Sequence, residues 1–448
     1  MTLVNDAAAP AVRSTGRKFR AFTVKHLDEL TARAGLSPEQ RLATRAVATV
    51  LPFRTNSYVV DELIDWSAAP DDPIYRLVFP QPDMLPADDV AHIADLLRRE
   101  APRHEVEAAA TKVRMRLNPH PAGQLELNVP SFGDGIVPGM QHKYDETVLY
   151  FPKQGQTCHA YCTYCFRWAQ FVGDPDLKLA GDEPARLRDY LLAHPEVTSV
   201  LFTGGDAMIM GEPVLRRYVE PLLGLEQVES IRIGTKSLAY WPQKFVTDPD
   251  ADAMLRLFEE VVESGKNLAF MAHFTHPREL EPALVREAVR RIRDTGAVIR
   301  TQAPLIRSIN DDPAAWESMW RTQTRLGMVP YYMFVERDTG PQDYFAVPLA
   351  RAYEIFRDAY KNVSGLARTV RGPSMSATPG KVCVDGVLDL AGEKVFALHF
   401  IQCRDADLVN KPFFAKYDPA AVWLDDLKPA FADHFPFHCG GATPHTPR

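Results

Sequence analysis

The chain has 448 residues, of which 46% are hydrophobic and 24% charged, a composition typical of a globular protein with a large core. The net charge of −7, without a long basic or acidic block, argues against a nucleic-acid partner or a membrane-surface patch. No apolar run reaches the roughly 20 residues of a membrane span, and the N-terminus lacks the apolar segment of a signal peptide. With six cysteines, three of them close together, we expect a protein of the reducing cytoplasm.

The first part of the chain predicts a helical N-terminal domain. Ser37 followed by Pro38 is a favourable helix start, with Ser as the N-cap and Pro in the first helical position. Residues 118–145, rich in Pro and Gly, predict an irregular crossing segment. We therefore assign residues 1–145 to a mobile lead-in, helices and this crossing loop. Helices are expected at 38–66 with interruptions, at 87–100 and at 105–117.

From Thr147 the chain alternates between short apolar runs, typical of buried parallel strands, and amphipathic helices. The helix expected over 252–263, for example, places Met254 and Phe258 on one face. Six β-α units are too few for a closed eight-unit barrel. We therefore expect an α/β fold, a six-unit partial (β/α)6 TIM-type barrel over 146–365, with its site at the carboxyl ends of the strands. The strands are expected at 148–151, 200–203, 231–234, 268–273, 298–302 and 331–335.

Residues 366–448 predict a small α+β C-terminal segment. Asp385-Gly386 is a signal for a hairpin turn within it. The expected elements are a loop at 374–381 and strands at 382–384 and 395–401.

Cys158, Cys162 and Cys165 form a C-x3-C-x2-C run. Three thiolates can hold three irons of a [4Fe–4S] cluster and leave the fourth iron open to a chelating small molecule. A structural zinc site, the other interpretation, usually has four ligands in paired spacing, and no second Cys/His pair follows closely. With Tyr164 and Phe166 beside the last cysteine, the run resembles the signature of radical S-adenosylmethionine (SAM) enzymes. The resemblance implies that the open iron binds SAM and that the reduced cluster cleaves it to a 5′-deoxyadenosyl radical.

A second motif, Gly204-Gly205-Asp206, follows the second expected strand. Its glycines let the backbone approach a ligand closely and its carboxylate can accept from an ammonium, although such a motif alone is equally typical of a turn. With other segments in the same order, it resembles the lysine 2,3-aminomutase family of radical SAM enzymes over about residues 70–385. These segments are 72–74, 142–144, 202–208, 232–236, 273–277, Gln302 and 310–311.

This resemblance implies an enzyme that uses pyridoxal 5′-phosphate (PLP) to move an amino group from C2 to C3 of an amino acid. A carbon radical at C3 cannot take the nitrogen directly, but an imine between that nitrogen and PLP offers a π-bond through which the radical can migrate. Such a reaction requires a Schiff-base lysine, a phosphate site and a group that binds the substrate carboxylate.

Matching positions assign roles to individual residues. Lys381 is the Schiff-base candidate, and Arg167 matches the arginine that binds the substrate carboxylate, a task suited to its planar guanidinium. His273 and Gln302 match positions that line the SAM and substrate site, and Gly204–Asp206 matches the motif that holds the SAM amino group. Without the resemblance, Lys381 would be interpreted as a surface loop lysine and His273 as a packed core histidine.

The chain also departs from the family at informative positions. Lys143 and Thr147 stand where the family has two arginines that bind the PLP phosphate, and Thr147 brings no charge. Arg337-Asp338 and Arg371 lie where lysine-specific members place two aspartates against the distal ammonium of the substrate. Since Arg371 would repel an ammonium, the substitution favours a distal carboxylate, as in glutamate. The alternative interpretation of these arginines is a surface ion pair.

The resemblance extends to further partners. It implies a small-molecule amino acid substrate, a reductant such as flavodoxin or ferredoxin, and a homo-oligomer. Family members carry a structural zinc between subunits, and Pro436 argues against a regular helix that would present a histidine pair to it. Zinc ligands could come from Cys383, Cys403, Cys439, His434 and His438.

We thus expect a radical SAM, PLP-dependent amino-acid 2,3-aminomutase, and three alternatives stay open. The first is a PLP-independent radical SAM enzyme that dehydrogenates or epimerises an amino acid, for which Thr147 is the reason. The second is an aminomutase that modifies a lysine of a protein partner. The third is a non-catalytic regulator that binds a cluster.

Overall fold

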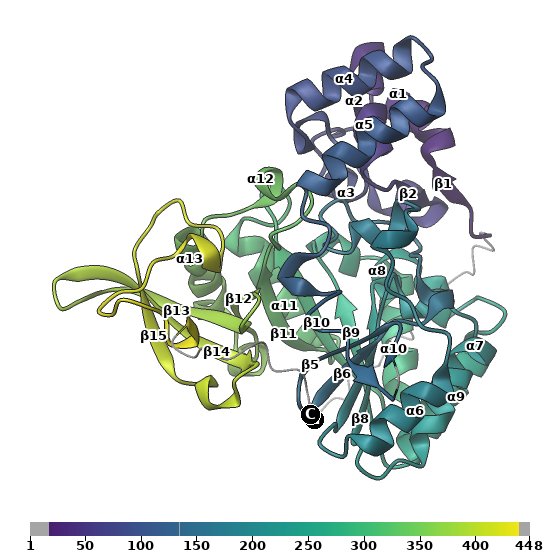
Figure 1. Cartoon of the computed structure of the whole chain (residues 1–448). Coiled ribbons are helices and arrows are strands. Elements are labelled where there is room, and N and C mark those ends of the chain that lie inside the picture. The colour runs from purple at the N-terminus through teal and green to yellow at the C-terminus, as the bar shows by residue number, and fades with distance from the viewer. Residues whose placement is uncertain (1–17, 134, 439–448) are drawn as a thin grey trace, which may run out of the picture.

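The computed structural model describes residues 18–133 and 135–438, and the expected lead-in at 1–17 lies outside them. Helices near the N-terminus gather at one end of the molecule (Figure 1). The start at Ser37 is confirmed: its Oγ accepts from the Gln40 N–H, and its own N–H donates to the Gln40 side chain. The helices are α1 (Leu27–Arg33), α2 (Pro38–Val50), α3 (Pro73–Val78), α4 (Ala87–Arg98) and α5 (Arg103–Arg116).

The helix expected over 38–66, with interruptions, is broken by a strand that the sequence does not predict. Helix α2 ends at Val50 because Pro52 forces the preceding Leu51 into an extended conformation. The chain then forms β2 (Arg54–Asn56), which pairs with β1 (Ala21–Thr23), before a single π-helical turn at Val59–Leu63.

The centre of the molecule is an eleven-stranded mixed sheet. Its strands β6 to β12 are all parallel, flanked by antiparallel β5 on one side and by β13, β14 and β15 on the other. All six expected strands are present. The strands are β5 (Met140–Tyr144), β6 (Thr147–Tyr150), β7 (Ser199–Phe202), β8 (Ser230–Thr235), β9 (Asn267–His273), β10 (Val298–Leu305), β11 (Val329–Val335), β12 (Arg371–Ser376), β13 (Gly380–Leu390), β14 (Glu393–Cys403) and β15 (Pro412–Lys416).

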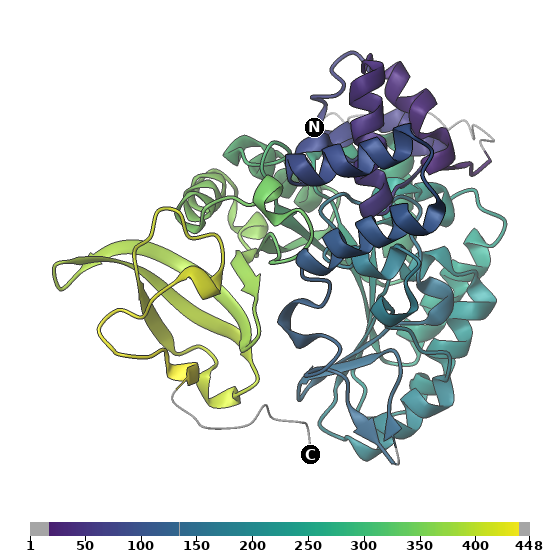
Figure 2. The same cartoon turned by 45° about the horizontal axis from the view of Figure 1, so that its top comes forward.

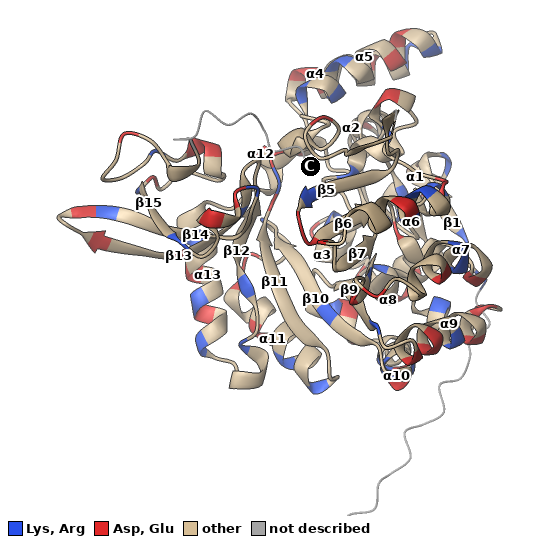
Figure 3. Ribbon diagram, turned by 60° about the horizontal axis from the view of Figure 1, so that its bottom comes forward, with Lys and Arg blue, Asp and Glu red and all other residues tan. Residues whose placement is uncertain are grey.

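Helices connect the parallel strands and lie along the outer side of the sheet (Figures 1 and 2). As the spacing predicts, α9 buries Met254, Phe258 and Val261. In Figure 3 the outer helices α9, α10 and α13 carry basic and acidic residues side by side. The helices are α6 (Pro184–Ala193), α7 (Glu212–Leu223), α8 (Ser237–Tyr240), α9 (Ala251–Glu263), α10 (Ala283–Asp294), α11 (Pro313–Arg325), α12 (Gln342–Phe345) and α13 (Leu349–Lys361).

The C-terminal strands continue the sheet, and two expectations about them are wrong. The loop expected at 374–381 is largely strand, since Ser376 at the end of β12 pairs with Lys381 in β13. Asp385-Gly386 lies inside β13, where the pairing register slips. The hairpin turn falls instead at Ala391-Gly392, whose φ angles of 52° and 85° are those that two-residue hairpin turns require.

Hydrophobic packing follows this layout. One large cluster joins the N-terminal helices to the parallel strands and their helices, and a second lies under β13, β14 and β15, around Phe396, Phe400 and Trp423. Within the described part of the chain, no helix has the length and apolar character needed to cross a bilayer.

Candidate active site

The three cysteines lie in the loop that follows β6, and all are free and half-buried. This loop packs against the end of β7. The N–H of Gly205 donates to the carbonyl of Gly155 (3.1 Å), and that of Asp206 donates to the carbonyl of Thr157 (2.8 Å). A Cβ at Gly205 would lie 2.3 Å from the oxygen of Thr157, and Gly204 has a φ of +142°. The glycine pair is therefore required for the cysteine loop to sit on the sheet.

Asp206 organises the neighbouring strand end. One carboxylate oxygen accepts from the N–H of Met208 (2.9 Å) and the hydroxyl of Thr235 (2.7 Å), and the other from the N–H of Lys236 (2.8 Å) and the hydroxyl of Ser237 (3.1 Å). Burial raises the pKa of this carboxyl, and the hydrogen bonds oppose the rise. Because these bonds use all four lone pairs, a contact with the SAM amino group requires that one be exchanged. That contact stays a prediction.

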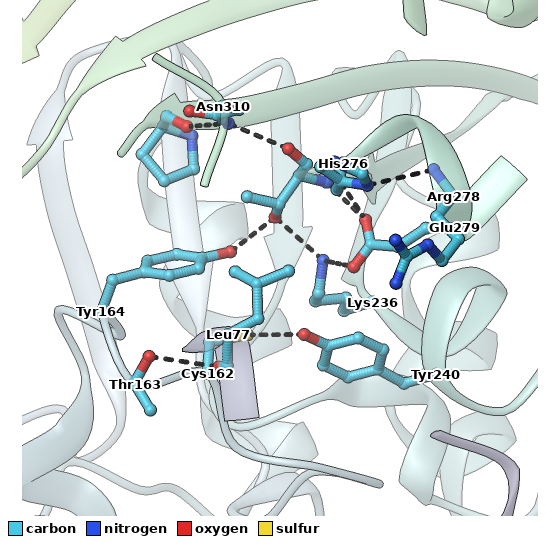
Figure 4. A network of polar contacts seen from close by, with 12 residues as sticks. Leu77, Cys162, Thr163, Tyr164, Lys236, Tyr240, His276, Arg278, Glu279 and Asn310 are labelled. Atoms are coloured by element: carbon cyan, nitrogen blue, oxygen red, sulfur yellow. Dashed lines mark hydrogen bonds and ion pairs between the residues drawn. The ribbon is translucent and has the colours of Figure 1, made fainter. Parts of the chain in front are cut away.

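A buried polar network lies behind Cys162 (Figure 4). The Lys236 ammonium is 2.8 Å from Oε1 of Glu279, a carboxylate without solvent exposure, and 3.0 Å from the hydroxyl of Thr275. Tyr164, one residue before the last cysteine, bonds to the same hydroxyl (2.8 Å). Burial raises the pKa of the Cys162 thiol, whereas the nearby Lys236 lowers it. The network holds the cysteine loop in place and puts the positive charge of Lys236 beside Cys162.

The cysteine loop fits an iron–sulfur cluster better than a single ion. Burial raises the pKa of all three thiols, that of Cys165 to about 12, and neighbouring thiols of the loop add to the rise at Cys158 and Cys165. Bound irons would compensate this repulsion between thiolates. Among the described residues, only Cys383, Asp385 and His399 have ligand atoms close enough together for one metal ion. The wider spacing of the loop thiols favours the cluster over the zinc alternative.

Beside this loop a cavity of about 340 Å³ opens on one face of the sheet. Its walls are strand residues two apart, such as Thr147 and Leu149 on β6, whose side chains share a face. Of the expected site residues, those that line it are Lys143, Thr147, Arg167, Gln302, Arg337, Arg371 and Lys381. Those that lie outside its lining are Gly204, Gly205, Asp206, His273 and Asp338.

The cavity is strongly cationic. Six lysine or arginine side chains line it, and its described lining contains no Asp or Glu. Two guanidinium nitrogens of the lining, Nη1 of Arg167 and Nε of Arg232, are buried without a hydrogen-bond partner among the described residues. The buried Nε of Arg337 has only the Asp338 carboxylate near it, at 3.6 Å. Arg167 is 7% exposed, with its guanidinium over Phe151 and Phe166, and burial lowers its pKa to about 9. Unpaired buried donors of this kind fit an anionic ligand.

Lys381 lies in this cavity, and its ammonium group loses its proton at a lower pH than that of an ordinary lysine. Burial, followed by the charges of Arg371 and Arg232, lowers its pKa to about 7. Its Nζ lies 3.1 Å from Oε1 of Gln402 and 3.4 Å from the hydroxyl of Tyr332. Much of it is therefore a free amine at neutral pH, the form that attacks a carbonyl, so the site fits PLP.

Of the two residues expected to bind the PLP phosphate, Lys143 and Thr147, only Lys143 can carry a charge. Lys143 donates to the carbonyl of Ala377 (2.6 Å), and burial, with Arg404 nearby, lowers its pKa well below the usual value. Thr147 is buried against the cavity. A phosphate here would meet Lys143 but no second cation from Thr147.

The remaining expected residues are placed as follows. His273 pairs across the sheet with Gln302, and burial lowers its pKa to about 3, so it is neutral at physiological pH. The Arg337 Nε lies 3.6 Å from a carboxylate oxygen of Asp338, whose backbone carbonyl accepts from Asn118.

The expected zinc ligands do not converge. Cys383 and Cys403 lie at different points of the β13–β14 pair, opposite His399 and Gly380 respectively. His434 is exposed, while Cys439 and the side chain of His438 lie outside what is described.

Two polar residues of the cavity near Lys381, Arg232 and Gln402, received no role from the sequence, although Arg232 opens the segment 232–236 of the resemblance. Arg232 stands between Ile231 and Ile233 in a buried strand, and an isolated charge in such a run signals a functional side chain. Gln402 comes from β14, and no local pattern marks it.

A three-cysteine loop after the first strand of a parallel sheet, beside a cationic cavity, defines the class of radical SAM enzymes. Comparison with family models finds no match. A protein of Aquifex aeolicus, provisionally named an L-lysine 2,3-aminomutase, is 31% identical over 414 residues, 92% of this chain and 97% of its own length. The chain therefore belongs to the lysine 2,3-aminomutase family and is a radical SAM aminomutase, an isomerase.

Other relatives match a smaller part of the chain. The L-lysine 2,3-aminomutase of Fusobacterium nucleatum is 27% identical over 52% of this chain and 52% of its own length. That of Clostridium subterminale is 26% identical over 59% of this chain and 60% of its own length. A solved radical SAM methyltransferase from Sphaerobacter thermophilus covers 79% of this chain and 94% of its own, at 15% identity and a TM-score of 0.35. That likeness is too weak to support an argument about the fold.

Proposed function

We propose that this aminomutase uses PLP, bound through Lys381, to move the amino group of an acidic α-amino acid, such as glutamate, from C2 to C3. The observation that carries the proposal is the cavity itself, in which a lysine with a pKa near 7 is surrounded by cations and by no carboxylate of the described lining. The six parallel strands β6 to β11 would form the six-unit partial barrel around it.

Each side chain then has a defined task. Lys381 attaches the cofactor, which supplies the π-system through which the substrate radical migrates. Arg167 presents its unpaired Nη1 to the α-carboxylate of the substrate, and the stacked Phe151 and Phe166 hold the guanidinium in place. Lys143 would bind the phosphate as a point charge, because a phosphate anion beside it stabilises the protonated amine that burial alone disfavours.

The charge of the cavity decides between substrate classes. Arg371 lies over the rings of Tyr331 and Tyr332, at 4.2 and 4.4 Å, and the buried Nε of Arg337 lies 3.6 Å from the carboxylate of Asp338. A lysine substrate would place its distal ammonium among these cations, at a cost of several kcal/mol for like charges in a buried site. A distal carboxylate would instead accept charge-assisted hydrogen bonds from these guanidinium groups.

The cluster side of the site completes the proposal. Cys158, Cys162 and Cys165 would hold the [4Fe–4S] cluster, and SAM would lie between this loop, Gln302 and the neutral imidazole of His273. Reduction of the cluster requires an external donor such as flavodoxin or ferredoxin. We also propose a cytoplasmic homo-oligomer.

Two measurements on anaerobically purified protein test the proposal. Borohydride treatment in the presence of PLP should leave a reduced adduct on Lys381, identified by peptide mass spectrometry. A Lys381→Ala variant should lose it, whereas the exposed Lys411→Ala should keep it. A panel of amino acids, assayed with SAM and dithionite, should give a β-amino product from glutamate; turnover of lysine in preference to glutamate overturns the acidic-substrate assignment.

Thr147 supports a second candidate, a PLP-independent radical SAM reaction on an amino acid. This residue lies in the cavity wall and offers no charge to a phosphate. SAM cleavage without any PLP adduct on Lys381 would favour a dehydrogenase or epimerase. A β-lysyl residue on a co-purifying protein would favour the protein-modifying alternative.

A further inference from the structure

A second cluster of ligand-type side chains lies outside the aminomutase cavity, on the β13–β14 pair. Cys383 and Asp385 are two residues apart in β13. His399 on β14 is the direct partner of Cys383. One potential ligand atom from each of the three lies within 4.8 Å of the others.

The strand irregularity at this point contributes to the arrangement. The register passes from Val384 opposite Leu398 to Gly386 opposite Ala397, which leaves Asp385 as the extra residue of a bulge. Bulges redirect side chains, and here the carboxylate of Asp385 reaches Nδ1 of His399 at 2.6 Å. The segment that resembled a hairpin turn in the sequence therefore assembles a side-chain triad.

The triad borders a cavity of its own, separate from that of Lys381. Cys383 is 6% exposed, whereas the side chains of His399 and Asp385 are 23% and 42% exposed, so the three groups range from a buried thiol to an accessible carboxylate. The cavity is also lined by Tyr360 and by Arg371, which borders both cavities. A ligand could thus enter from solvent and meet the thiol last.

We propose that Cys383, Asp385 and His399 bind one divalent cation of the zinc class. Thiol sulfur, imidazole nitrogen and carboxylate oxygen are the donors that zinc takes in proteins, and three protein ligands leave a fourth position for water or another ligand. The cation would take the place of the proton between His399 and Asp385, so the neutral imidazole would carry its proton on Nε2, and the thiol of Cys383 would lose its proton to solvent.

Charge balance supports a divalent ion at this place. A thiolate on Cys383 and a carboxylate on Asp385 would repel each other across the bulge, and a cation between them removes this repulsion. With a neutral His399, the two negative ligands cancel the charge of the ion. The occupied site would therefore add no net charge beside Arg371, and the proposed anion-binding role of that arginine would be preserved.

This site differs from the zinc site considered from the sequence. It lies within one chain and does not include Cys403, whose thiol donates to the carbonyl of Pro379 (3.4 Å). Cys403→Ala is therefore a matched control: a second buried cysteine of the same strand pair is removed, and the triad is left intact.

The test measures zinc in full-length protein whose iron–sulfur cluster has been reconstituted anaerobically, with a chromophoric zinc chelator in competition. The wild type and Cys403→Ala should each bind one zinc per chain, and Cys383→Ser and His399→Gln should each weaken binding by more than about 100-fold. Iron content and circular dichroism equal to those of the wild type would show that these variants are folded.

X-ray absorption at the zinc edge supplies a second measurement. One sulfur at about 2.3 Å, with nitrogen or oxygen ligands at about 2.0–2.2 Å, is expected. Two or more sulfurs, zinc retained by Cys383→Ser, or no binding by the wild type at micromolar free zinc would each overturn the proposal. None of these results depends on aminomutase turnover, so the outcome is separable from that of the proposed function.

Discussion

Arg371 and Lys381 lie against the same aromatic ring. The guanidinium carbon of Arg371 is 4.4 Å from the ring centroid of Tyr332, and the Nζ of Lys381 is 4.5 Å from it. After burial, the charge of Arg371 is the largest influence that lowers the pKa of Lys381 to about 7. The residue proposed to select the substrate therefore also tunes the residue proposed to hold the cofactor.

This coupling predicts a shift in pH dependence. The free amine of Lys381 reacts with PLP, so adduct formation should rise with pH through a midpoint near 7. In Arg371→Gln a positive neighbour is lost, the protonated amine is less disfavoured, and the midpoint should move to higher pH. The rate of adduct formation against pH measures it. Arg300→Gln, which removes an arginine over Tyr331 outside the cavity, should leave the midpoint unchanged.

Arg371 should also control substrate choice. If it pairs with a distal carboxylate, Arg371→Gln removes a charge-assisted hydrogen bond of about 1.5–3 kcal/mol and should lower kcat/KM for glutamate by about 10- to 100-fold. Steady-state assays with glutamate and an uncharged amino acid of similar size measure the effect. An equal loss for both substrates would contradict a role in distal-carboxylate recognition.

The glycine pair after β7 predicts a specific defect in cluster assembly. In Gly205→Ala the new Cβ would meet the backbone of Thr157 at 2.3 Å, so the cysteine loop must move. We expect less iron per chain after reconstitution and a weaker cluster absorption. Gly224→Ala has no heavy atom within 4 Å of its added Cβ and should assemble a normal cluster. Full iron loading of Gly205→Ala would show that the close packing is dispensable.

The ion pair behind Cys162 should be a large stabilising element. Glu279→Ala leaves the ammonium of Lys236 buried without its partner, and should lower the free energy of unfolding by about 3–5 kcal/mol. Denaturant titration against the wild type tests this value. Glu287→Ala breaks an ion pair with the exposed Arg290 and should cost about 1 kcal/mol or less. Equal effects of the two substitutions would contradict the assigned role of the buried pair.

The sequence predicts those elements whose signal lies in neighbouring residues, and it fails where contacts with distant residues decide the structure. Strands such as 268–273 were found because a parallel strand covered on both faces is a continuous apolar run. The helical spacing over 38–66 does not reveal β2, because the effect of Pro52 on Leu51 ends α2 at Val50. Asp385-Gly386 predicts a turn because the dipeptide is common in hairpins, and only pairing with β14 shows that it is a bulge.

The sequence by itself determined the chemistry that depends on close spacing. Cys158, Cys162 and Cys165 lie within eight residues, and the β-α rhythm repeats over short intervals, so both are readable without long-range contacts. Only the tertiary structure decided what surrounds them. The cationic cavity joins Lys143, Arg232 and Lys381 from β5, β8 and β13, because strand register and the alternation of side chains determine which residues share a face.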